Sequence, residues 1–226
     1  GCGQKRKDRT TSGFAKENWT ELRFDINESV EPDYIGTMTD MSAVETSSMD
    51  ALFSSHNIEH LYAHEVPKAL AEFKRVLRPD GFVVITCPDI QAICALVAQD
   101  KLTDQAYPSP AGPITPHDIL YGHGTSLAEG HLFMAHRCGF TQKVLAKVLE
   151  ASGFVSLATA KRPSPDFDLW AVGCLGKTSE ESLRGLIKDH FPFSKPSGEP
   201  ASTSSLKNKR ESLQKSTKEL GIPYST

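Results

Sequence analysis

The stretch His64–Asp89, HEVPKALAEFKRVLRPDGFVVITCPD, decides the fold class. Its apolar residues recur at spacings of four, three and four from Val66 to Leu77, which predicts a helix over His64–Leu77 with one apolar face. Arg78–Gly81 should end this helix, because proline disfavours helical backbone in the residue before it and Asp-Gly suits a turn. Gly81–Cys87 is β-branched and apolar on both faces, which is typical of an interior strand of a parallel sheet.

Strand-like and helix-like stretches alternate on both sides of this segment. Three strands are expected upstream, at Thr20–Ile26, Asp33–Thr37 and Met49–Ser55. Downstream we expect helices over Ile90–Gln99 and Thr141–Ala151, then strands over Phe154–Ala160 and Phe167–Leu175. The alternation predicts an α/β fold: a Rossmann-like, doubly wound, mostly parallel sheet with helices on both faces and a closing antiparallel strand pair.

Composition divides the chain into a domain over 1–176 and a polar tail over 177–226. Within the domain, Thr103–Gly130 holds four prolines and four glycines, so we expect an ordered loop or lid and not a core element. The tail is low in apolar residues and should be largely disordered. A short amphipathic helix over Glu180–His190 is the alternative for its first part.

The overall composition limits the classes of partner. A net charge of −3 among 226 residues gives no electrostatic argument for nucleic acid or a membrane, and no apolar run approaches the roughly 20 residues that span a bilayer. The five cysteines are scattered and form no Cys-x-x-Cys pair. A reduced, cytoplasmic setting is therefore expected. The sequence leaves the oligomeric state open.

Two motifs resemble the class I S-adenosylmethionine-dependent methyltransferases, specifically the small-molecule group with a type 11-like domain. His64–Asp89 is similar to that family's helix, proline turn and following strand, with Pro79-Asp80-Gly81 where the family usually has Pro-Gly-Gly. Met49–Leu61, MDALFSSHNIEHL, is similar to its fourth strand and the turn after it. The resemblance covers roughly Gly1–Leu175. It implies S-adenosyl-L-methionine as cofactor and methyl transfer to a small-molecule acceptor.

The resemblance also assigns cofactor contacts. Asp25 lies at the end of the expected strand Thr20–Ile26, which corresponds to the family's second strand, where the family places an acid that accepts from both ribose hydroxyls. Asp40-Met41 resembles the position that meets adenine, and Gly1-Cys2-Gly3 resembles the glycine-rich turn beside the methionine half of the cofactor. The predicted cofactor-binding set is Gly1, Cys2, Gly3, Asp25, Ile26, Asp40, Met41, Ser55 and His56.

The family's first strand should lie before Gly1, in the middle of the sheet and beside the cofactor. We therefore expect the natural chain to begin earlier and the cofactor site to be incomplete in this stretch alone. A dinucleotide site is the weaker alternative for the glycine turn, because it needs a third glycine and Gln4–Arg6 provides none.

The segment after the fifth strand builds the substrate pocket in this family. His60, Tyr107 and Tyr121 are the residues predicted to contact the acceptor, and His123 or His136 is predicted to act as general base. For each of these side chains, ordinary loop packing and hydrogen bonding is the alternative.

The string His56-x-x-Glu59-His60 matches the inverted zinc-protease pattern. That pattern needs a continuous helix so that both histidines face one metal, whereas this stretch leaves a strand. We predict no metal site and keep a zinc hydrolase as the weaker alternative. A non-catalytic cofactor-binding or interaction module on the same fold is the other alternative, because fold alone does not decide function.

Overall fold

A computed structural model describes residues 1, 3–162 and 164–192 of the chain. The chain divides into a compact unit over Gly1–Phe191 and a second unit over Pro192–Thr226. Only the first unit is described below. The disorder expected for the far tail, and the predicted cofactor residue Cys2, lie outside the described residues.

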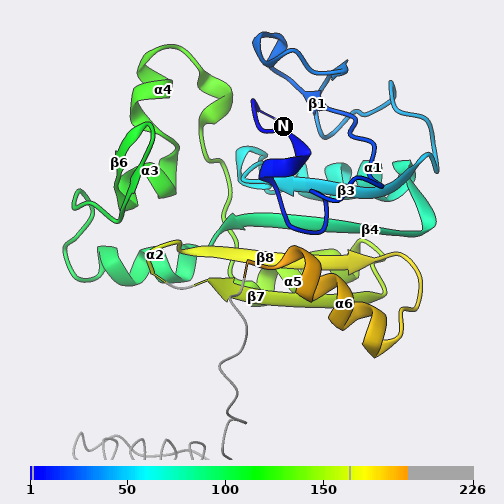
Figure 1. Cartoon of the computed structure of the whole chain (residues 1–226). Helices are drawn as coiled ribbons and strands as arrows, with labels where there is room; N and C mark the ends of the chain where they lie inside the picture. Colours follow the sequence, from blue (N-terminus) through cyan, green and yellow to red (C-terminus); the bar gives the residue numbers. More distant parts are fainter. Residues whose placement is uncertain (2, 163, 193–226) are drawn as a thin grey trace, which may run out of the picture. The chain divides into compact units, whose positions relative to one another are not determined.

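Four strands form the main sheet in the order β3–β4–β8–β7 (Figure 1). Their bounds are β3 Met49–Ser55, β4 Leu77–Pro88, β7 Ser156–Arg162 and β8 Asp168–Cys174. β3 and β4 run parallel, while β8 is antiparallel to both of its neighbours. A separate parallel pair joins β1, Phe24–Asp25, to β2, Tyr34–Ile35. The predicted α/β class and its closing antiparallel strand pair are confirmed.

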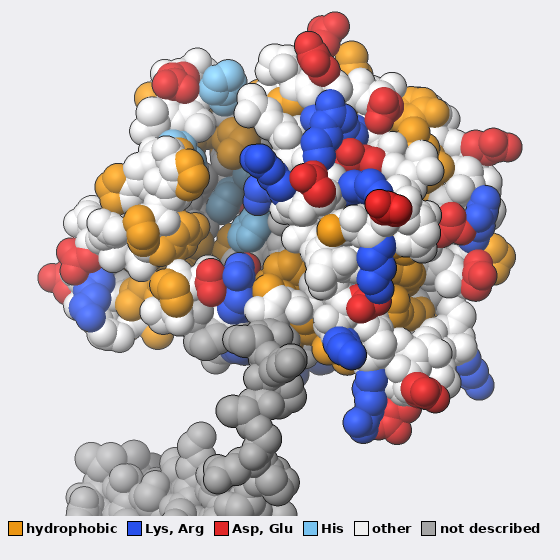
Figure 2. Space-filling view, in the orientation of Figure 1, with side chains coloured by type: hydrophobic (Ala, Val, Ile, Leu, Met, Phe, Trp, Pro, Cys, Tyr) orange, Lys and Arg blue, Asp and Glu red, His pale blue; other side chains and the backbone are white. Residues whose placement is uncertain are grey.

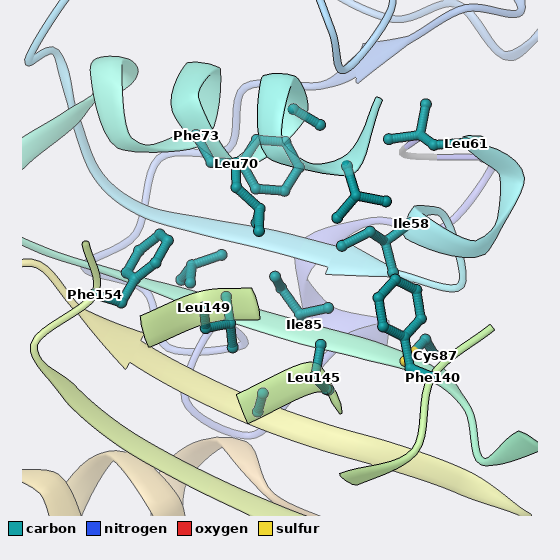
Figure 3. Packing of buried hydrophobic residues seen from close by; sticks show 14 of the residues in the cluster. Ile58, Leu61, Leu70, Phe73, Ile85, Cys87, Phe140, Leu145, Leu149 and Phe154 are labelled. Carbon is teal, nitrogen blue, oxygen red and sulfur yellow. The ribbon is translucent and has the colours of Figure 1, made fainter. Parts of the chain in front are cut away.

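Helices cover both faces of the main sheet (Figure 1). The longer ones are α1 Val66–Val76, α2 Ile90–Val97, α5 Gln142–Ala151 and α6 Glu180–His190, and short 3₁₀ turns are η1 Lys7–Arg9, η2 Glu28–Val30, η3 Ile58–His60 and η4 Leu132–Met134. α1 and α5 pack on one face of the sheet in the main core, which Figure 3 shows from close by. α6 packs on the other face with the aromatic side chain of Phe14.

Strand β4 lies at the centre of both layers. Val83 and Ile85 point into the main core, whereas Val84 between them belongs to the core under α6. Successive side chains of a strand point to opposite faces, so a strand covered on both faces has to be apolar at nearly every position. This geometry explains the continuous apolar run that predicted the strand.

The turn expected after α1 is built into the start of β4. Leu77 already has extended backbone and pairs with Met49, and the register then shifts before Ala51 pairs with Phe82. A Cβ at Gly81 would lie 2.9 Å from the carbonyl oxygen of Arg78, so glycine lets the chain turn tightly here. The helix itself ends one residue earlier than predicted.

The packing of α6 corrects the expected domain boundary at 176. Leu183, Leu186 and Ile187 face the sheet, so the compact unit continues to Phe191. The sequence alternative of an amphipathic helix over Glu180–His190 therefore describes this segment, and its apolar stripe has a partner surface that composition alone did not reveal.

His190 ties the end of α6 to the N-terminal segment. Its ring is 3% exposed, packs 4.3 Å from the Phe14 ring, and shares a 2.8 Å hydrogen bond between Nδ1 and the hydroxyl of Thr11. Burial removes the water that would stabilise the charged imidazolium and lowers the pKa of His190 to about 4.

We expect His190 to make the fold sensitive to mild acid. Between about pH 6.5 and 4 the ring of His190 is protonated in the unfolded chain but stays neutral in the folded one. The free energy of unfolding therefore falls as the pH falls, by about 2 kcal/mol from pH 8 to pH 5. Urea denaturation of the wild type and of His190→Gln at both pH values measures this loss. The glutamine variant should lose most of that difference, while the exposed control His64→Gln should keep it; equal pH dependence in all three would contradict the assignment.

Candidate functional site

A cavity of about 160 Å³ opens at the carboxyl ends of β3 and β4, beside the segment that follows α2. Figure 2 shows pale blue histidine side chains in a hollow on this side of the molecule. The lining includes His56, Glu59 and His60 after β3, Tyr107, Asp118, His123 and His136 from the later segment, and Asp166 and Phe167 before β8. In open α/β sheets ligands bind outside the carboxyl ends of the strands, so this is where a site is expected.

The proline-rich segment forms one wall of this cavity with secondary structure of its own. It contains the hairpin β5 Tyr107–Ser109 and β6 Gly112–Ile114, then the short helices α3 Pro116–Tyr121 and α4 Gly124–Ala128. Reciprocal bonds cap α3: the Thr115 hydroxyl accepts from the Asp118 N–H, and the Asp118 carboxylate accepts from the Thr115 N–H. The expected ordered loop therefore has a folded structure of its own. We call residues 90–139, which include this segment, the excursion from the sheet.

This excursion is closed at its base. Asp89 and Phe140 pair as an isolated bridge, and the N–H of Ile90 donates to the Phe140 carbonyl at 3.1 Å. The chain thus leaves the sheet at the start of α2 and returns beside the same point. The cavity wall is fixed to the main sheet at that junction.

Four of the five histidine and tyrosine side chains predicted for the acceptor site line the cavity together. These are His60, Tyr107, His123 and His136. Tyr121 is exposed, with its ring 5.0 Å from the ring of His117, and it is not among the lining residues. The structure therefore brings most of this set to one place, while their contact with an acceptor stays a prediction.

His56 occupies the sharp turn after β3 with a left-handed backbone, φ = 51°. The turn is held by the His56 N–H, which donates to the Thr86 carbonyl at 2.9 Å, and by a 2.9 Å hydrogen bond between the hydroxyls of Ser55 and Thr86. The predicted residues Ser55 and His56 thus sit at the junction of β3 and β4. As the sequence analysis expected, His56 lies in a turn and not in a helix.

Two acids flank the ring of His56. Its Nδ1 lies 3.5 Å from a carboxylate oxygen of Glu59, and its Nε2 lies 3.8 Å from one of Asp168. Partial loss of water around the ring lowers the pKa of His56, but the nearby carboxylates of Asp168 and Glu59 outweigh this effect and raise it to about 9. His56 is therefore a cation at neutral pH, which stabilises both carboxylates in their charged form.

Glu59 is the most deeply buried acid of the cavity. Its side chain is 2% exposed, and within the described residues neither carboxylate oxygen has a hydrogen-bond partner. Burial alone would raise the pKa of Glu59, but the neighbouring His56 outweighs burial and lowers it. Sequence reasoning considered Glu59 only as part of the zinc-protease pattern.

Asp168 was not predicted at all. It opens the buried strand β8, and its carboxylate receives two hydrogen bonds from Arg162, at 2.9 and 2.6 Å. Burial would raise the pKa of Asp168, but Arg162 and His56 outweigh it and hold it low. An acid at the start of the otherwise apolar stretch Asp168–Cys174 was the signal that could have revealed it.

The rings of His60 and His136 pack edge to face with their centroids 4.9 Å apart. Each uses Nδ1 toward a backbone carbonyl: His60 toward Ala135 at 3.2 Å, and His136 toward Ile119 at 2.7 Å. Because a carbonyl oxygen only accepts, Nδ1 carries the proton in both contacts, and Nε2 is left with a lone pair in the neutral ring. Burial lowers the pKa of His136 and favours this neutral form.

The pattern His56-x-x-Glu59-His60 does not lie on a continuous helix. Only Ile58–His60 is helical, as a single 3₁₀ turn, and His56 precedes it in the left-handed conformation. The geometry that an inverted zinc protease requires is thus missing. A different group meets instead: ligand atoms of Glu59, His60 and His136 all lie within 4.8 Å of one another.

The glycine turn and Asp25 come together beside this site. The Gly3 N–H donates to the Asp25 carboxylate at 2.8 Å, and the Asn57 side-chain amide donates to the Gly1 carbonyl at 2.9 Å. A Cβ placed on Gly1 would lie 2.6 Å from the Asn57 side-chain oxygen and 3.1 Å from an Asp25 oxygen, so a larger residue would displace the Asn57 side chain. Residues that the resemblance assigns to both halves of the cofactor therefore converge at the carboxyl ends of β1 and β3.

The remaining predicted cofactor residues lie apart from that cluster or face elsewhere. Asp40 has an exposed carboxylate that accepts from the Ser42 N–H at 3.1 Å within a turn. Met41 is buried in the main core, which leaves it little surface to offer to an adenine ring. Ile26 is exposed directly after β1.

Comparison with known families identifies part of the chain. Residues 13–85 match a family model described as a methyltransferase domain, a segment that runs from before β1 into β4. This segment is methyltransferase-like. The resemblance predicted from His64–Asp89 and Met49–Leu61 is confirmed there, and the methyltransferase-like segment ends at the strand that borders the cavity.

Solved structures of methyltransferases are similar to this chain at low sequence identity. They include a S-adenosylmethionine-dependent methyltransferase of Thermotoga maritima, a possible histamine N-methyltransferase, with 12% identity, 66% of this chain and 67% of that chain covered, and a TM-score of 0.43. A S-adenosylmethionine-dependent methyltransferase of Archaeoglobus fulgidus has 14% identity, coverage of 67% and 74%, and a TM-score of 0.45. The 1,6-didemethyltoxoflavin-N1-methyltransferase of Burkholderia thailandensis, solved with its substrate and S-adenosylhomocysteine, has 16% identity, coverage of 69% and 60%, and a TM-score of 0.39.

No curated protein matches the chain in sequence. Among the helices of the described residues, none has the length and apolar character needed to cross a bilayer.

Proposed function

We propose that this protein transfers a methyl group from S-adenosyl-L-methionine to a small-molecule acceptor bound in the cavity. One observation carries the proposal: the single turn after β3 serves both places. Asn57 in that turn binds the glycine turn beside Asp25, while its neighbour His56 lines the cavity. A cofactor held at the first place would thus lie next to an acceptor held at the second.

The chain's own residues would bind, orient and dry the reactants. The bound cofactor would supply an electrophilic methyl group on a sulfonium. The backbone of the glycine turn and the Asp25 carboxylate suit the methionine half and the ribose, respectively. Residues of α3 and the hairpin line one side of the cavity, and exclusion of water by a bound acceptor would favour a transfer in which the sulfonium charge disperses.

His123 and His136 are the candidate bases for an acceptor that must lose a proton. Both line the cavity, and the Nδ1 of His123 is hydrogen-bonded to the Ser126 hydroxyl at 2.9 Å. The Nε2 lone pair of His136, fixed by the contact of Nδ1 with Ile119, can accept a proton. Either ring would take it from a hydroxyl or amine held in the cavity.

Binding of S-adenosylhomocysteine to the full-length protein tests the cofactor site. Asp25→Asn keeps the size of the side chain but removes the charge that strengthens hydrogen bonds from the ribose hydroxyls, so we expect calorimetric titration to show affinity at least tenfold weaker than for the wild type. The exposed control Asp8→Asn should bind as the wild type does. Absence of binding to the wild type would refute the proposal, and equal affinity in Asp25→Asn would refute the role of Asp25.

Transfer of a labelled methyl group from S-adenosyl-L-methionine to a panel of hydroxyl and amine acceptors tests catalysis. Binding of the cofactor without transfer to any acceptor class would favour the non-catalytic module instead.

A further inference from the structure

We infer that Glu59, His60 and His136 form a binding site for a divalent transition-metal ion in the wall of the cavity. Two imidazoles and one carboxylate offer ligand atoms that lie within 4.8 Å of one another, from two segments far apart in the sequence. Such a set of two nitrogens and one oxygen suits ions such as Zn²⁺, Fe²⁺ or Co²⁺ better than the oxygen-preferring Ca²⁺ or Mg²⁺. Methyl transfer does not by itself require this site.

The buried carboxylate of Glu59 has unmet hydrogen-bonding capacity. A buried carboxylate is costly unless its oxygens are paired or coordinate a cation. Both Glu59 oxygens lack a hydrogen-bond partner in the part of the chain that the structure describes, and the residue lines the cavity. His56 approaches one of these oxygens at 3.5 Å, which leaves the second oxygen to be accounted for. A metal ion in the cavity wall would account for it.

The two histidines are oriented as metal-binding histidines usually are. A histidine that binds a metal through one nitrogen usually donates the N–H of the other to a carbonyl or carboxylate, which fixes the tautomer and the ring. His60 and His136 both have this arrangement, through the carbonyls of Ala135 and Ile119. Their Nε2 atoms are then the available ligands. Both rings are therefore already oriented to coordinate an ion beside the buried Glu59 carboxylate.

Backbone hydrogen bonds fix the distance between the two segments that carry the ligands. The N–H groups of Arg137 and Cys138 both donate to the carbonyl of Glu59, at 2.8 and 3.2 Å. The two residues that follow His136 are therefore tied to the residue that carries the carboxylate. Small shifts of side chains, and not of backbone, are enough to bring the three ligand atoms around one ion.

Three protein ligands leave coordination positions open toward the cavity. An oxygen or nitrogen of the acceptor can bind there, and the ion would lower the pKa of a hydroxyl bound to it. With Nε2 of His136 on the metal, His123 remains as the candidate base of the cavity. Binding of the acceptor to the ion rests on the proposed methyl transfer, whereas the metal site itself does not.

Titration of tag-free, chelator-treated full-length protein with Co²⁺ tests the site. We expect visible absorption bands that saturate at one equivalent, displacement of these bands by Zn²⁺, and a Zn²⁺-dependent rise in the unfolding temperature. Glu59→Gln and His136→Gln should each weaken Co²⁺ binding at least tenfold. His131→Gln, an exposed histidine outside the cavity lining, is the matched control and should bind as the wild type does.

Two results would overturn the inference: absence of Co²⁺ binding to the wild type, or unchanged affinity in both Glu59→Gln and His136→Gln. Circular dichroism of each variant before titration shows whether it is folded, and the partly exposed His136 keeps the test valid if the buried Glu59 variant is not. Binding of S-adenosylhomocysteine to the same metal-free protein is measured separately. Failure of the metal site is thereby distinguished from failure of the cofactor site.

Discussion

Replacing Gly122 by alanine is expected to disrupt the cavity wall and to lower the free energy of unfolding by about 3 kcal/mol. Gly122 ends α3 with φ = 102° and ψ = 156°, a backbone region that is essentially restricted to glycine. A Cβ there would also overlap the carbonyl oxygen of Met134 and lie 3.0 Å from the Cα of Ala135. Since both obstacles are backbone atoms, the chain has to move and not merely a side chain.

The displacement would reach the cavity because the same contact positions His136. The His136 N–H donates to the carbonyl of Tyr121, next to Gly122, and its ring is held by Ile119 in the same helix. Hydrogen exchange over α3 and η4 should therefore rise in Gly122→Ala, while exchange in β4 and β8 should change less. Urea denaturation measures the loss of stability.

Gly130→Ala is the matched control for this experiment. Gly130 also has a positive φ, 92°, but a Cβ there would meet nothing within 4 Å. It isolates the conformational cost of alanine, about 1 kcal/mol, from the cost of the clash. Equal destabilisation by the two substitutions would show that the packing of Gly122 against Met134 does not hold the wall.

Phe73→Ala is expected to have the largest effect on the scaffold, about 4 kcal/mol. Phe73 lies on the buried face of α1 and packs in the main core, where Figure 3 shows it beside Leu70. Truncation to alanine removes apolar area from the core and leaves a cavity that the sheet cannot readily close, because the neighbouring β4 is covered on both faces.

Urea denaturation followed by far-ultraviolet circular dichroism measures this effect. Lys68→Ala, on the exposed face of the same helix, should change stability by less than about 0.5 kcal/mol. A loss below about 1 kcal/mol in Phe73→Ala would indicate that α1 is not part of the cooperative core.

The scaffold could be predicted from sequence wherever one local pattern decided an element. The strand over Met49–Ser55 and the helix over Glu180–His190 have the bounds expected from their apolar patterns. Thr141 caps α5, as its hydroxyl and position indicated. The helix at α1 begins at Val66 and not at His64, because Glu65 turns back to accept from the Tyr62 N–H at 2.9 Å.

The structure of residues 103–130 was harder to predict because the apolar residues of this segment do not recur at a regular spacing. Prolines and glycines hide the hairpin β5–β6, and the capping of α3 depends on one Thr115–Asp118 pair. No hydrophobic repeat announces elements of three to six residues. The sequence could predict an ordered excursion there, but not its internal structure.

The polar lining of the site was predicted only in part. His60, Tyr107, His123 and His136 were found because the resemblance pointed to their segments. The partnership of His56 with Asp168, and the approach of His136 to Glu59, join residues that lie 112 and 77 positions apart in the sequence. Local sequence carries no signal for such pairs, since they are created by the order of strands in the sheet.

The bridge between Asp89 and Phe140 allows the cavity wall to vary in length and sequence independently of the main sheet. Because the chain departs and returns at one hydrogen-bonded junction, the cost of closing the excursion is set mainly there and grows only slowly with its length. We therefore expect relatives of this protein to differ in the length and sequence of residues 90–139 while the sheet is kept. We expect acceptor preference to diverge through this part of the chain while the turn after β3, which both sites share, is kept.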